Sequence, residues 1–313
     1  MRTTKAVINL CNLDHNVKEL VKLLKPGTSF MAVVKANAYG HGAYVVSSQA
    51  LKSGASCLGV ATAEEGAELR EAGIKAPILV LGGIDISDVE TVSQFDLDQC
   101  VFSTDLLDGL NKEGIKRGKR INIHIKIDTG MNRIGISRVE EFERFLKEAK
   151  GLSNLRLDGI FTHFATADEA DRTFTREQLE RFTEMLNIVK KHNLQPKWVH
   201  AANSAAILVS PDTHFNLVRA GISMYGYYPS SEMDKTQVSL LPVMQWETRI
   251  LCVKEVNQGE SISYGRTFYA PTPMRIATLP IGYADGYKRI LSNKGHVLRS
   301  EERRVGKECR SRW

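Results

Sequence analysis

The stretch Ala32-Val33-Val34-Lys35-Ala36-Asn37-Ala38-Tyr39-Gly40-His41-Gly42 joins an apolar run to a segment punctuated by glycine. The apolar run begins at Ser29, and its length and composition predict a buried strand that ends at Lys35. Gly40 and Gly42 allow the backbone to turn sharply next to a ligand. Burial disfavours the ammonium form of lysine, and an unprotonated amine can form a Schiff base with an aldehyde cofactor. Lys35 is therefore the first candidate for a catalytic residue, although lysines also end strands for structural reasons.

Short apolar runs alternate with segments of helical period from about residue 28 to residue 227. Capping boxes predict helix starts at Thr62 (with Glu65), Ser137 (with Glu140) and Thr175 (with Gln178). The expected strands are 29–35, 57–61, 76–81, 99–102, 121–127, 157–163, 198–201 and 217–224. Eight strands that alternate with helices predict an α/β fold, a (β/α)8 TIM-type barrel over residues 1–235. The first few residues could instead pack with the domain that follows.

The pattern changes after Tyr228, where Pro229-Ser230-Ser231-Glu232-Met233-Asp234-Lys235 predicts a linker. Segments 244–256, 259–264 and 274–280 are rich in β-branched and aromatic residues, with glycine and proline between them. They predict a mainly β C-terminal domain over residues 236–298. Because this pattern is still running at residue 298, we expect that domain to be incomplete.

Residues 299–313 differ in composition from the rest of the chain. They hold five arginines and one lysine against three glutamates, which is +3 of the formal net charge of +6. The segment has no amphipathic period, and it resembles the translation of a common sequencing-adapter oligonucleotide. We therefore expect a non-native tail, with a genuine basic tail as the alternative.

Composition limits the classes of function. Hydrophobic residues make up 42% of the chain and charged residues 25%, as in soluble globular proteins. No apolar run reaches the ~18 residues of a membrane span, and the apolar stretch at the start is too short for a signal peptide. No basic stripe is interleaved with aromatic residues, so we expect neither nucleic acid nor membrane as a partner. The five cysteines are scattered and predict reduced thiols in a cytoplasmic protein.

Polar residues stand at the ends of the later strands. They are Arg133, His163, His200, Asn203, Ser204 and Arg219, and Gly221 lets main-chain N–H groups approach a ligand closely. The carboxyl ends of barrel strands meet on one face, so we expect these groups to share one site. Asn203-Ser204 could open a helix whose N-terminal amides suit a phosphate, and Tyr39 could hydrogen-bond the same group. Taken singly, each residue has a structural alternative, such as a core histidine for His200 or a surface ion pair for Arg133.

A metal site is the rival use of His163 and His200. Neither histidine has a partner at H-x-x-x-H spacing, and no dense carboxylate cluster accompanies them in the sequence. We therefore predict no metal.

In combination these motifs resemble the alanine racemase family, from residue 1 to about residue 298. The matching segments occur in the family's order: the stretch around Lys35, then 126–135, 162–168, 200–204, 219–226, Ser263-Tyr264-Gly265 and Ile281-Gly282-Tyr283-Ala284-Asp285-Gly286. The resemblance implies pyridoxal 5'-phosphate as cofactor and the interconversion of L-alanine and D-alanine, which supplies D-alanine for peptidoglycan synthesis.

The resemblance also implies two proton-transfer groups. Lys35 would hold the cofactor and act on D-alanine, while Tyr264 would act on L-alanine from the opposite face. A proton removed from one face must be returned to the other, so racemisation needs such a pair. A chain from Tyr264 through His163 and Arg219 to His200 would supply the positive neighbours that let a tyrosine act as a base. Arg219 would face the pyridine nitrogen and keep it unprotonated, because a guanidinium hardly gives up its proton.

Further site residues follow from the same resemblance. Arg133 would bind the cofactor's phenolic oxygen and help to hold the substrate. Lys126 matches a lysine that is often carbamylated in the family. The residues expected around the phosphate are Tyr39, Ser204, Gly221 and Ile222, with Asn203 also binding the cofactor.

In this family the second domain of one subunit caps the barrel of the other, so the resemblance implies a homodimer with shared sites. Tyr264 would then serve the partner subunit's Lys35, and Tyr283 would line the route by which the substrate enters. The family pattern continues with a Cys-Met-Asp segment and a further phosphate-binding tyrosine, neither of which this chain contains. We expect this departure to affect carboxylate binding, the β domain and the dimer.

Three other functions compete with this interpretation. A non-catalytic pyridoxal-phosphate-binding protein on the same barrel is disfavoured because the chain continues to Ser263-Tyr264-Gly265. A fold-type-III amino-acid decarboxylase is disfavoured by Tyr264 and by the stretch 200–204. A serine or broad-specificity racemase stays open, because one extra hydroxyl is weakly discriminated by a pocket that has no dedicated partner for it.

Overall fold

The computed structural model describes residues 3–299. It divides into two compact units, one of residues 9–243 and one of residues up to 8 together with residues from 244 onward. The predicted boundary at residue 235 therefore lies inside the first unit, and the start of the chain belongs to the second.

The first unit is built on eight parallel strands. They are β2 (Ser29–Val33), β3 (Cys57–Val60), β4 (Ile78–Val80), β5 (Asp98–Val101), β6 (Ile121–Lys126), β7 (Leu155–Phe161), β8 (Trp198–His200) and β9 (Leu217–Ala220). Their order in the sheet is β8-β7-β6-β5-β4-β3-β2-β9, and every pair in it is parallel.

Backbone hydrogen bonds join the two ends of this sheet. Asn216 N donates to Val199 O (3.4 Å), and Arg219 N donates to Ala202 O (3.0 Å). The sheet therefore closes on itself almost completely, and the predicted TIM-type barrel is confirmed.

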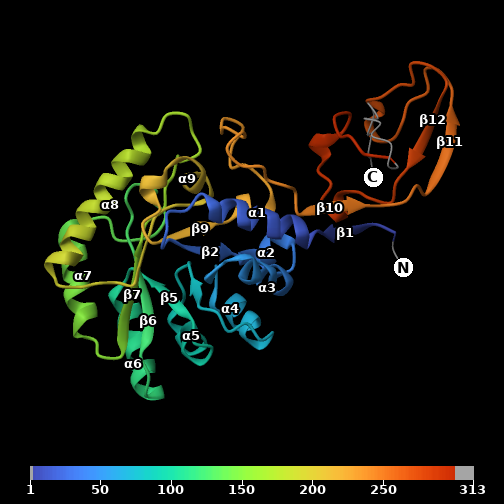
Figure 1. The fold of residues 1–313 in the computed structure, drawn as a ribbon. Helices are drawn as coiled ribbons and strands as arrows, with labels where there is room; N and C mark the ends of the chain where they lie inside the picture. Colours follow the sequence, from blue (N-terminus) through green and yellow to red (C-terminus); the bar gives the residue numbers. More distant parts are fainter. Residues whose placement is uncertain (1–2, 300–313) are drawn as a thin grey trace. The chain divides into compact units, whose positions relative to one another are not determined.

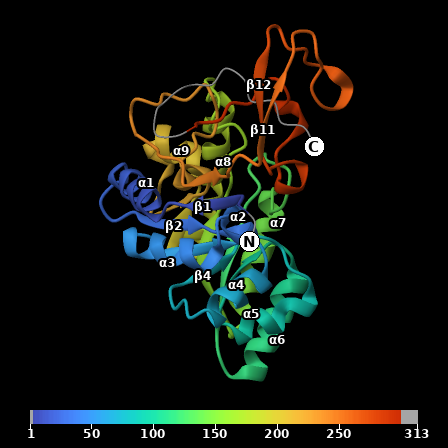
Figure 2. The ribbon, with the colours of Figure 1, turned by 90° about the vertical axis from the view of Figure 1, so that its right-hand side faces the viewer.

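Helices follow the strands around the outside of this unit (Figure 1), and Figure 2 shows the same unit after a quarter turn. They are α1 (Leu10–Lys22), α2 (Lys35–Gly40), α3 (Ala43–Ser53), α4 (Ala63–Glu71), α5 (Val89–Gln94), α6 (Thr104–Arg117), α7 (Val139–Gly151), α8 (Thr173–Lys191) and α9 (Ser204–Val209). Each of α4 to α7 contacts the next helix along the chain, as expected of a barrel's outer layer.

The predicted helix starts are correct in one case of three. Thr62 caps α4, with Glu65 N donating to its hydroxyl at 3.4 Å. Helix α7 instead begins after Arg138, and α8 begins at Thr173. Thr175 lies inside α8. Gln178 is buried, and its side-chain amide accepts from Ala165 N (2.9 Å) and donates to His163 O (3.2 Å). A sequence pattern alone could not distinguish this tertiary bridge from a cap.

The core of the barrel has an apolar cluster of Met31, Cys57, Leu79 and Leu217, each at most 4% exposed. Its other buried residues include several polar side chains from β5 to β9, which the strand alternation turns inward. Those used below are Asp98, His124, Lys126, Asp158, His200 and Arg219.

The second unit is mainly β. Strand β1 (Lys5–Ile8) pairs antiparallel with β10 (Met244–Glu247), and β11 (Cys252–Val256) pairs antiparallel with β12 (Met274–Thr278). Thr4 Oγ1 donates to Pro280 O (2.6 Å), so the two ends of this unit are joined. The predicted strand 259–264 is replaced by a bridge between Ser261 and Tyr269 and a 3-10 turn at Tyr264–Arg266, because Ser263 and Gly265 have positive φ.

The predicted tail, residues 299–313, lies outside the described residues except for Arg299. Within residues 3–299 we find no helix with the length and apolarity that a membrane crossing requires.

Candidate active site

A cavity of about 500 Å³ opens at the carboxyl ends of the barrel strands. Its lining includes Lys35, Tyr39, Lys126, Arg133, His163, Asn203, Ser204, Arg219, Gly221 and Ile222, all of which the sequence predicted as site residues. It also includes Val33, Ala61, Leu81, Gly82, Gly83, Ile134, Phe161, Asp168, Ala205 and Pro229, which the sequence did not single out. His200 lies behind this lining and is fully buried.

Lys35 does not end a strand. Strand β2 stops at Val33, and Lys35 begins α2, where it is half-buried rather than buried. The four residues that follow, Ala36 to Tyr39, have φ between 51° and 54° and form a left-handed turn. For residues with a side chain, this conformation costs roughly 1–2 kcal/mol each, so surrounding contacts must stabilise it.

Those contacts come from both ends of the turn. The Glu65 carboxylate accepts from Ala36 N and from Ala61 N, each at 2.7 Å. At the far end, Gly42 N donates to Asn37 O (3.0 Å), and the Asn37 side chain accepts from Ala43 N (2.8 Å). Hydrogen bonds at both ends therefore hold the strained turn that follows Lys35, and such strain is common at functional sites.

A second group of residues forms a corner beside β9. Ser204 Oγ accepts from Gly221 N (2.9 Å) and Ser223 N (3.3 Å). A Cβ on Gly221 would lie 3.2 Å from the Tyr39 hydroxyl, so the glycine leaves this corner open. Burial raises the pKa of Tyr39, which keeps its hydroxyl a donor at neutral pH. Asn203 caps α9 by accepting from Ala206 N (3.1 Å), as predicted for a helix start.

Arg219 is the centre of a buried hydrogen-bond chain. Its guanidinium donates to His200 Nδ1 (2.9 Å), His163 Nδ1 (3.1 Å) and Thr162 O (2.8 Å). Burial, followed by the charge of Arg219, holds the pKa of both histidines well below its usual range, so both rings are neutral. Burial also lowers the pKa of Arg219 to about 9, which still leaves it charged at neutral pH.

Lys126 is the buried lysine of the site. It is 4% exposed, and its Nζ donates to Ile127 O (3.2 Å) and lies 5.0 Å from the Phe161 ring centroid. Burial, followed by the charge of Arg219, lowers its pKa to about 7. The sequence predicted burial for Lys35, whereas in the structure Lys126 is the more deeply buried of these two lysines.

The cavity is rich in positive charge. Lys35, Lys126, Arg133 and Arg219 all line it, and among residues 3–299 none of them has a carboxylate at ion-pair distance. Asp168, which is acidic, also lines the cavity. Such a cavity suits a ligand with several negative charges.

His124 extends the buried hydrogen-bond chain behind the cavity lining and was not predicted. Its Nδ1 lies 3.0 Å from His200 Nε2, and the ring is 1% exposed. A signal for it exists in the sequence, because His124 is two residues before Lys126 and side chains two apart on a strand share a face. His124, Asp98 and Asp158 also bring potential ligand atoms within 4.8 Å of one another.

Tyr264 and Tyr283 belong to the second unit, where they are 72% and 46% exposed. The residues that line the cavity all belong to the first unit.

Comparison with known proteins gives one family. The N-terminal domain model of alanine racemase matches residues 8–229, and its C-terminal domain model matches residues 243–308. An alanine racemase of Desulforamulus reducens is 46% identical over 97% of this chain and 83% of its own length. One of Methanococcus maripaludis is 42% identical over 94% and 78%.

Solved structures show the same likeness. Alanine racemase from Bacillus anthracis with bound L-Ala-P is 38% identical with a TM-score of 0.88, over 95% of this chain and 77% of that one. Histidine racemase from Leuconostoc mesenteroides is 26% identical with a TM-score of 0.85, over 94% and 78%.

Proposed function

Since this chain belongs to the alanine racemase family, we propose that it binds pyridoxal 5'-phosphate in the barrel cavity and interconverts L-alanine and D-alanine. The observation that carries this proposal is Lys35 at the edge of a cavity that holds three further cations, none of which has a carboxylate partner within residues 3–299. Its product would serve peptidoglycan synthesis in the cytoplasm.

The residues of the cavity fit this cofactor. Its volume of about 500 Å³ is that of a small-ligand site. Lys35 offers an amine for the aldehyde, and Arg133 and Arg219 offer charge for an anionic ring. When bound, the cofactor withdraws electrons from the α-carbon of the amino acid and makes its proton easier to remove.

The phosphate would bind at the corner beside β9. The Tyr39 hydroxyl and the backbone around Gly221 and Ile222 face this part of the cavity, and Ser204 holds that backbone in place. An added side chain at position 221 would crowd the tyrosine, so the glycine keeps the space in which a phosphate could lie.

Arg219 and His163 would set the charge of the site. Arg219 stays protonated and can face the pyridine nitrogen only as a donor, which would keep that nitrogen unprotonated. His163 accepts from Arg219 at Nδ1, so its remaining proton is on Nε2. That N–H is available to stabilise a tyrosinate.

Tyr264 would be that tyrosine. As the family resemblance implies, it would exchange a proton with L-alanine on one face while Lys35 exchanges one with D-alanine on the other. We propose that the site is shared in a homodimer, in which Tyr264 serves the partner subunit's Lys35 and Tyr283 lines the substrate route.

Lys126 would carry a carbamate. Because its pKa is about 7, a large share of its amine is neutral at physiological pH and can attack carbon dioxide, which would form an N–C bond and release one amine proton to water. The product would carry a negative charge next to Arg133, which would then be oriented toward the substrate.

Racemisation of another amino acid is the second candidate. The structure of a histidine racemase has the same fold over 94% of this chain, so the fold accommodates substrates larger than alanine.

The test is an amino-acid racemase assay on the chain loaded with pyridoxal 5'-phosphate. We expect turnover of alanine in both directions and slower turnover of serine and histidine. In Tyr264→Phe, exchange of the α-hydrogen of L-alanine with deuterated water should fall far more than that of D-alanine. Exposed Tyr269, in the same unit, provides the matched control as Tyr269→Phe. Equal losses from both enantiomers would refute the two-base assignment, and absence of alanine turnover would refute the function.

A further inference from the structure

A chain of buried polar side chains continues from Arg219 toward the amino ends of the strands. His200 Nε2 lies 3.0 Å from His124 Nδ1, and His124 Nε2 lies 4.0 Å from Asp98 Oδ2. His200, His124 and Asp98 are 0%, 1% and 8% exposed. None of the three lines the cavity, so their effect on the site acts through Arg219.

Arg219 determines the direction of every hydrogen bond in this chain. A guanidinium only donates, so His200 Nδ1 and His163 Nδ1 must both accept from it. A ring nitrogen that accepts carries no proton. Because both rings are neutral, each holds its proton on Nε2.

The same logic extends to His124. The Nε2–H of His200 points at His124 Nδ1, which must therefore accept. Burial lowers the pKa of His124 to about 3, so this ring is also neutral and its proton is on Nε2. That nitrogen has no hydrogen-bond partner among the described residues and lies 4.0 Å from Asp98 Oδ2, while Asp98 Oδ1 accepts from Asn122 Nδ2 (2.8 Å).

Packing holds the His124 ring in this orientation. A Cβ on Gly159 of the neighbouring strand would lie 2.1 Å from His124 Nδ1. The strand register shifts at this point, between Ile123 and His124. The ring therefore occupies a slot that only a glycine opposite leaves free.

We propose that His124 and Asp98 are positioning residues for Arg219. The Asp98 carboxylate keeps the proton of His124 on Nε2, which leaves Nδ1 as the acceptor for His200 and, in turn, His200 Nδ1 as the acceptor for Arg219. At 4.0 Å Asp98 acts through its charge rather than through a hydrogen bond. A proton on His124 Nδ1 would face the Nε2–H of His200. A proton on His200 Nδ1 would face an N–H of Arg219. The expected effect on turnover rests on the proposed function, whereas the expected positions of the histidine protons do not depend on it.

A metal ion at this cluster would need the opposite arrangement. His124 could bind a metal only through an Nε2 without a proton, which places its proton on Nδ1, against the N–H of His200. The third member of the cluster, Asp158, is paired with Arg156 (3.1 Å). The hydrogen-bond directions set by Arg219 therefore favour a proton at His124 Nε2.

The first experiment measures tautomers by ¹⁵N NMR of histidine-labelled protein, with and without pyridoxal 5'-phosphate. We expect His124, His163 and His200 as Nε2–H forms. In Asp98→Asn, an amide that can donate replaces the carboxylate, and we expect a share of His124 in the Nδ1–H form. We also expect kcat for alanine to fall about tenfold, because Arg219 loses a well-placed acceptor, with KM changed less than about twofold.

Asp96→Asn is the matched control. Asp96 loses the same charge two residues away, but its side chain is 79% exposed and pairs with Lys119. Asparagine also tolerates its positive φ of 49°. We expect wild-type tautomers and wild-type kcat.

A second pair of variants tests His124 itself. The Asn side chain of His124→Asn keeps an acceptor for His200, whereas His124→Leu has similar size and none. We expect Asn to retain most of kcat and Leu to lose it, with folding of both checked by thermal melting. Wild-type His200 in the Nδ1–H form, a metal-bound His124, or unchanged tautomers and kcat in Asp98→Asn would each overturn the inference. A wild type with the expected tautomers but no racemisation would refute the proposed function alone.

Discussion

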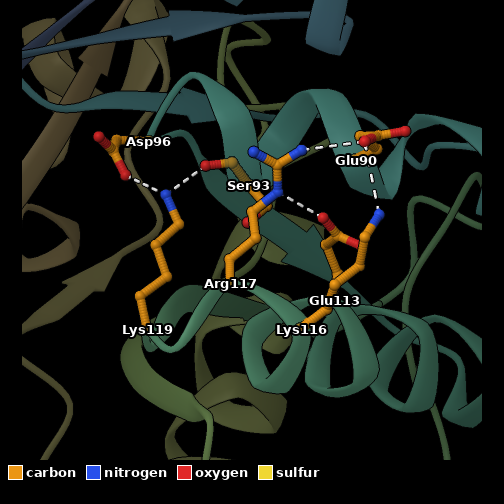
Figure 3. A network of polar contacts seen from close by, with 7 residues as sticks. All are labelled: Glu90, Ser93, Asp96, Glu113, Lys116, Arg117 and Lys119. Atoms are coloured by element: carbon orange, nitrogen blue, oxygen red, sulfur yellow. Dashed lines mark hydrogen bonds and ion pairs between the residues drawn. The ribbon is translucent and has the colours of Figure 1, made fainter.

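Two regions of the molecule are rich in lysine and arginine but use them in opposite ways. On the outer surface, helices α5 and α6 are joined by a network in which every cation has an anionic partner (Figure 3). Arg117 pairs with Glu113 (2.5 Å) and Glu90 (3.0 Å), and Lys119 pairs with Asp96. In the barrel cavity, the cations have no such partners among the described residues.

The difference shows where charge serves structure and where it serves a ligand. Exposed pairs are screened by water and contribute little to stability. Buried cations without partners cost free energy, which here lowers the pKa of Lys126 to about 7 and of Arg219 to about 9. Such an arrangement is expected where a bound anion completes the charge balance.

The largest effect should come from Lys35→Ala. Without the amine, the absorbance band of bound pyridoxal 5'-phosphate should disappear, and racemisation should fall by about a thousandfold or more. Lys116→Ala, which removes a lysine of the surface network, is the control and should keep both. A full-strength band in Lys35→Ala would contradict the assignment.

A smaller effect should come from Lys126. Its carbamate should give a signal in ¹³C NMR after incubation with labelled bicarbonate, and Lys126→Ala should lack that signal and lose about ten- to a hundredfold in activity. Only the neutral amine reacts, so with a pKa of about 7 the signal should increase between pH 6 and pH 8. The same signal in Lys126→Ala would assign it to another lysine.

Asp98 should make stability depend on pH. Burial raises its pKa from 3.8 to about 6, partly offset by the hydrogen bond from Asn122. The folded state then binds a proton more tightly than the unfolded state, so stability should decrease as pH rises from about 4 to 6, by at most about 3 kcal/mol.

Urea unfolding of the wild type and Asp98→Asn across this range measures the effect. The variant should lose this part of the pH dependence. For Glu113 in the surface network we expect the opposite pH dependence of stability, because the hydrogen bond from Arg117 lowers its pKa. If the free energy of unfolding of the wild type and of Asp98→Asn changed with pH in the same way, Asp98 would not titrate as described.

The smallest effects should come from the surface network. Lys116→Ala and Lys119→Ala should each change the free energy of unfolding by less than about 1 kcal/mol and leave activity unchanged. Thermal melting at low and high salt checks this, since salt should reduce even that difference. A loss of several kcal/mol would mean that the network is structurally essential.

Much of the barrel could be predicted from local patterns. The starts of the expected strands 29–35, 57–61, 121–127, 198–201 and 217–224 coincide with strands of the structure, because buried parallel strands are short apolar runs bounded by turn residues. The predicted ends of the first and last of these strands, at residues 35 and 224, lie beyond the ends of β2 at Val33 and β9 at Ala220. The left-handed turn after Lys35 and the 3-10 turn at Ile222–Tyr225 depend on contacts made from other parts of the barrel.

The sequence predicted which residues form the site, but not how deeply each is buried or which groups surround it. Residues after strand ends lie on one face of any barrel, so Arg133, His163 and Ser204 followed from position alone. The missed residues, His124 and Asp98, lie within strands rather than after them. Their importance comes from Arg219, which is far away in the sequence.

Local sequence was thus sufficient for the barrel, for its polar carboxyl-terminal face and for Lys35 as the candidate amine. Three-dimensional packing was needed to show that Lys126 is buried with a lowered pKa, that Glu65 stabilises the turn after Lys35, and that a polar chain runs from Arg219 to Asp98. The physical reason is that periodicity is a property of consecutive residues, whereas burial, pKa and hydrogen-bond direction are set by neighbours from other strands.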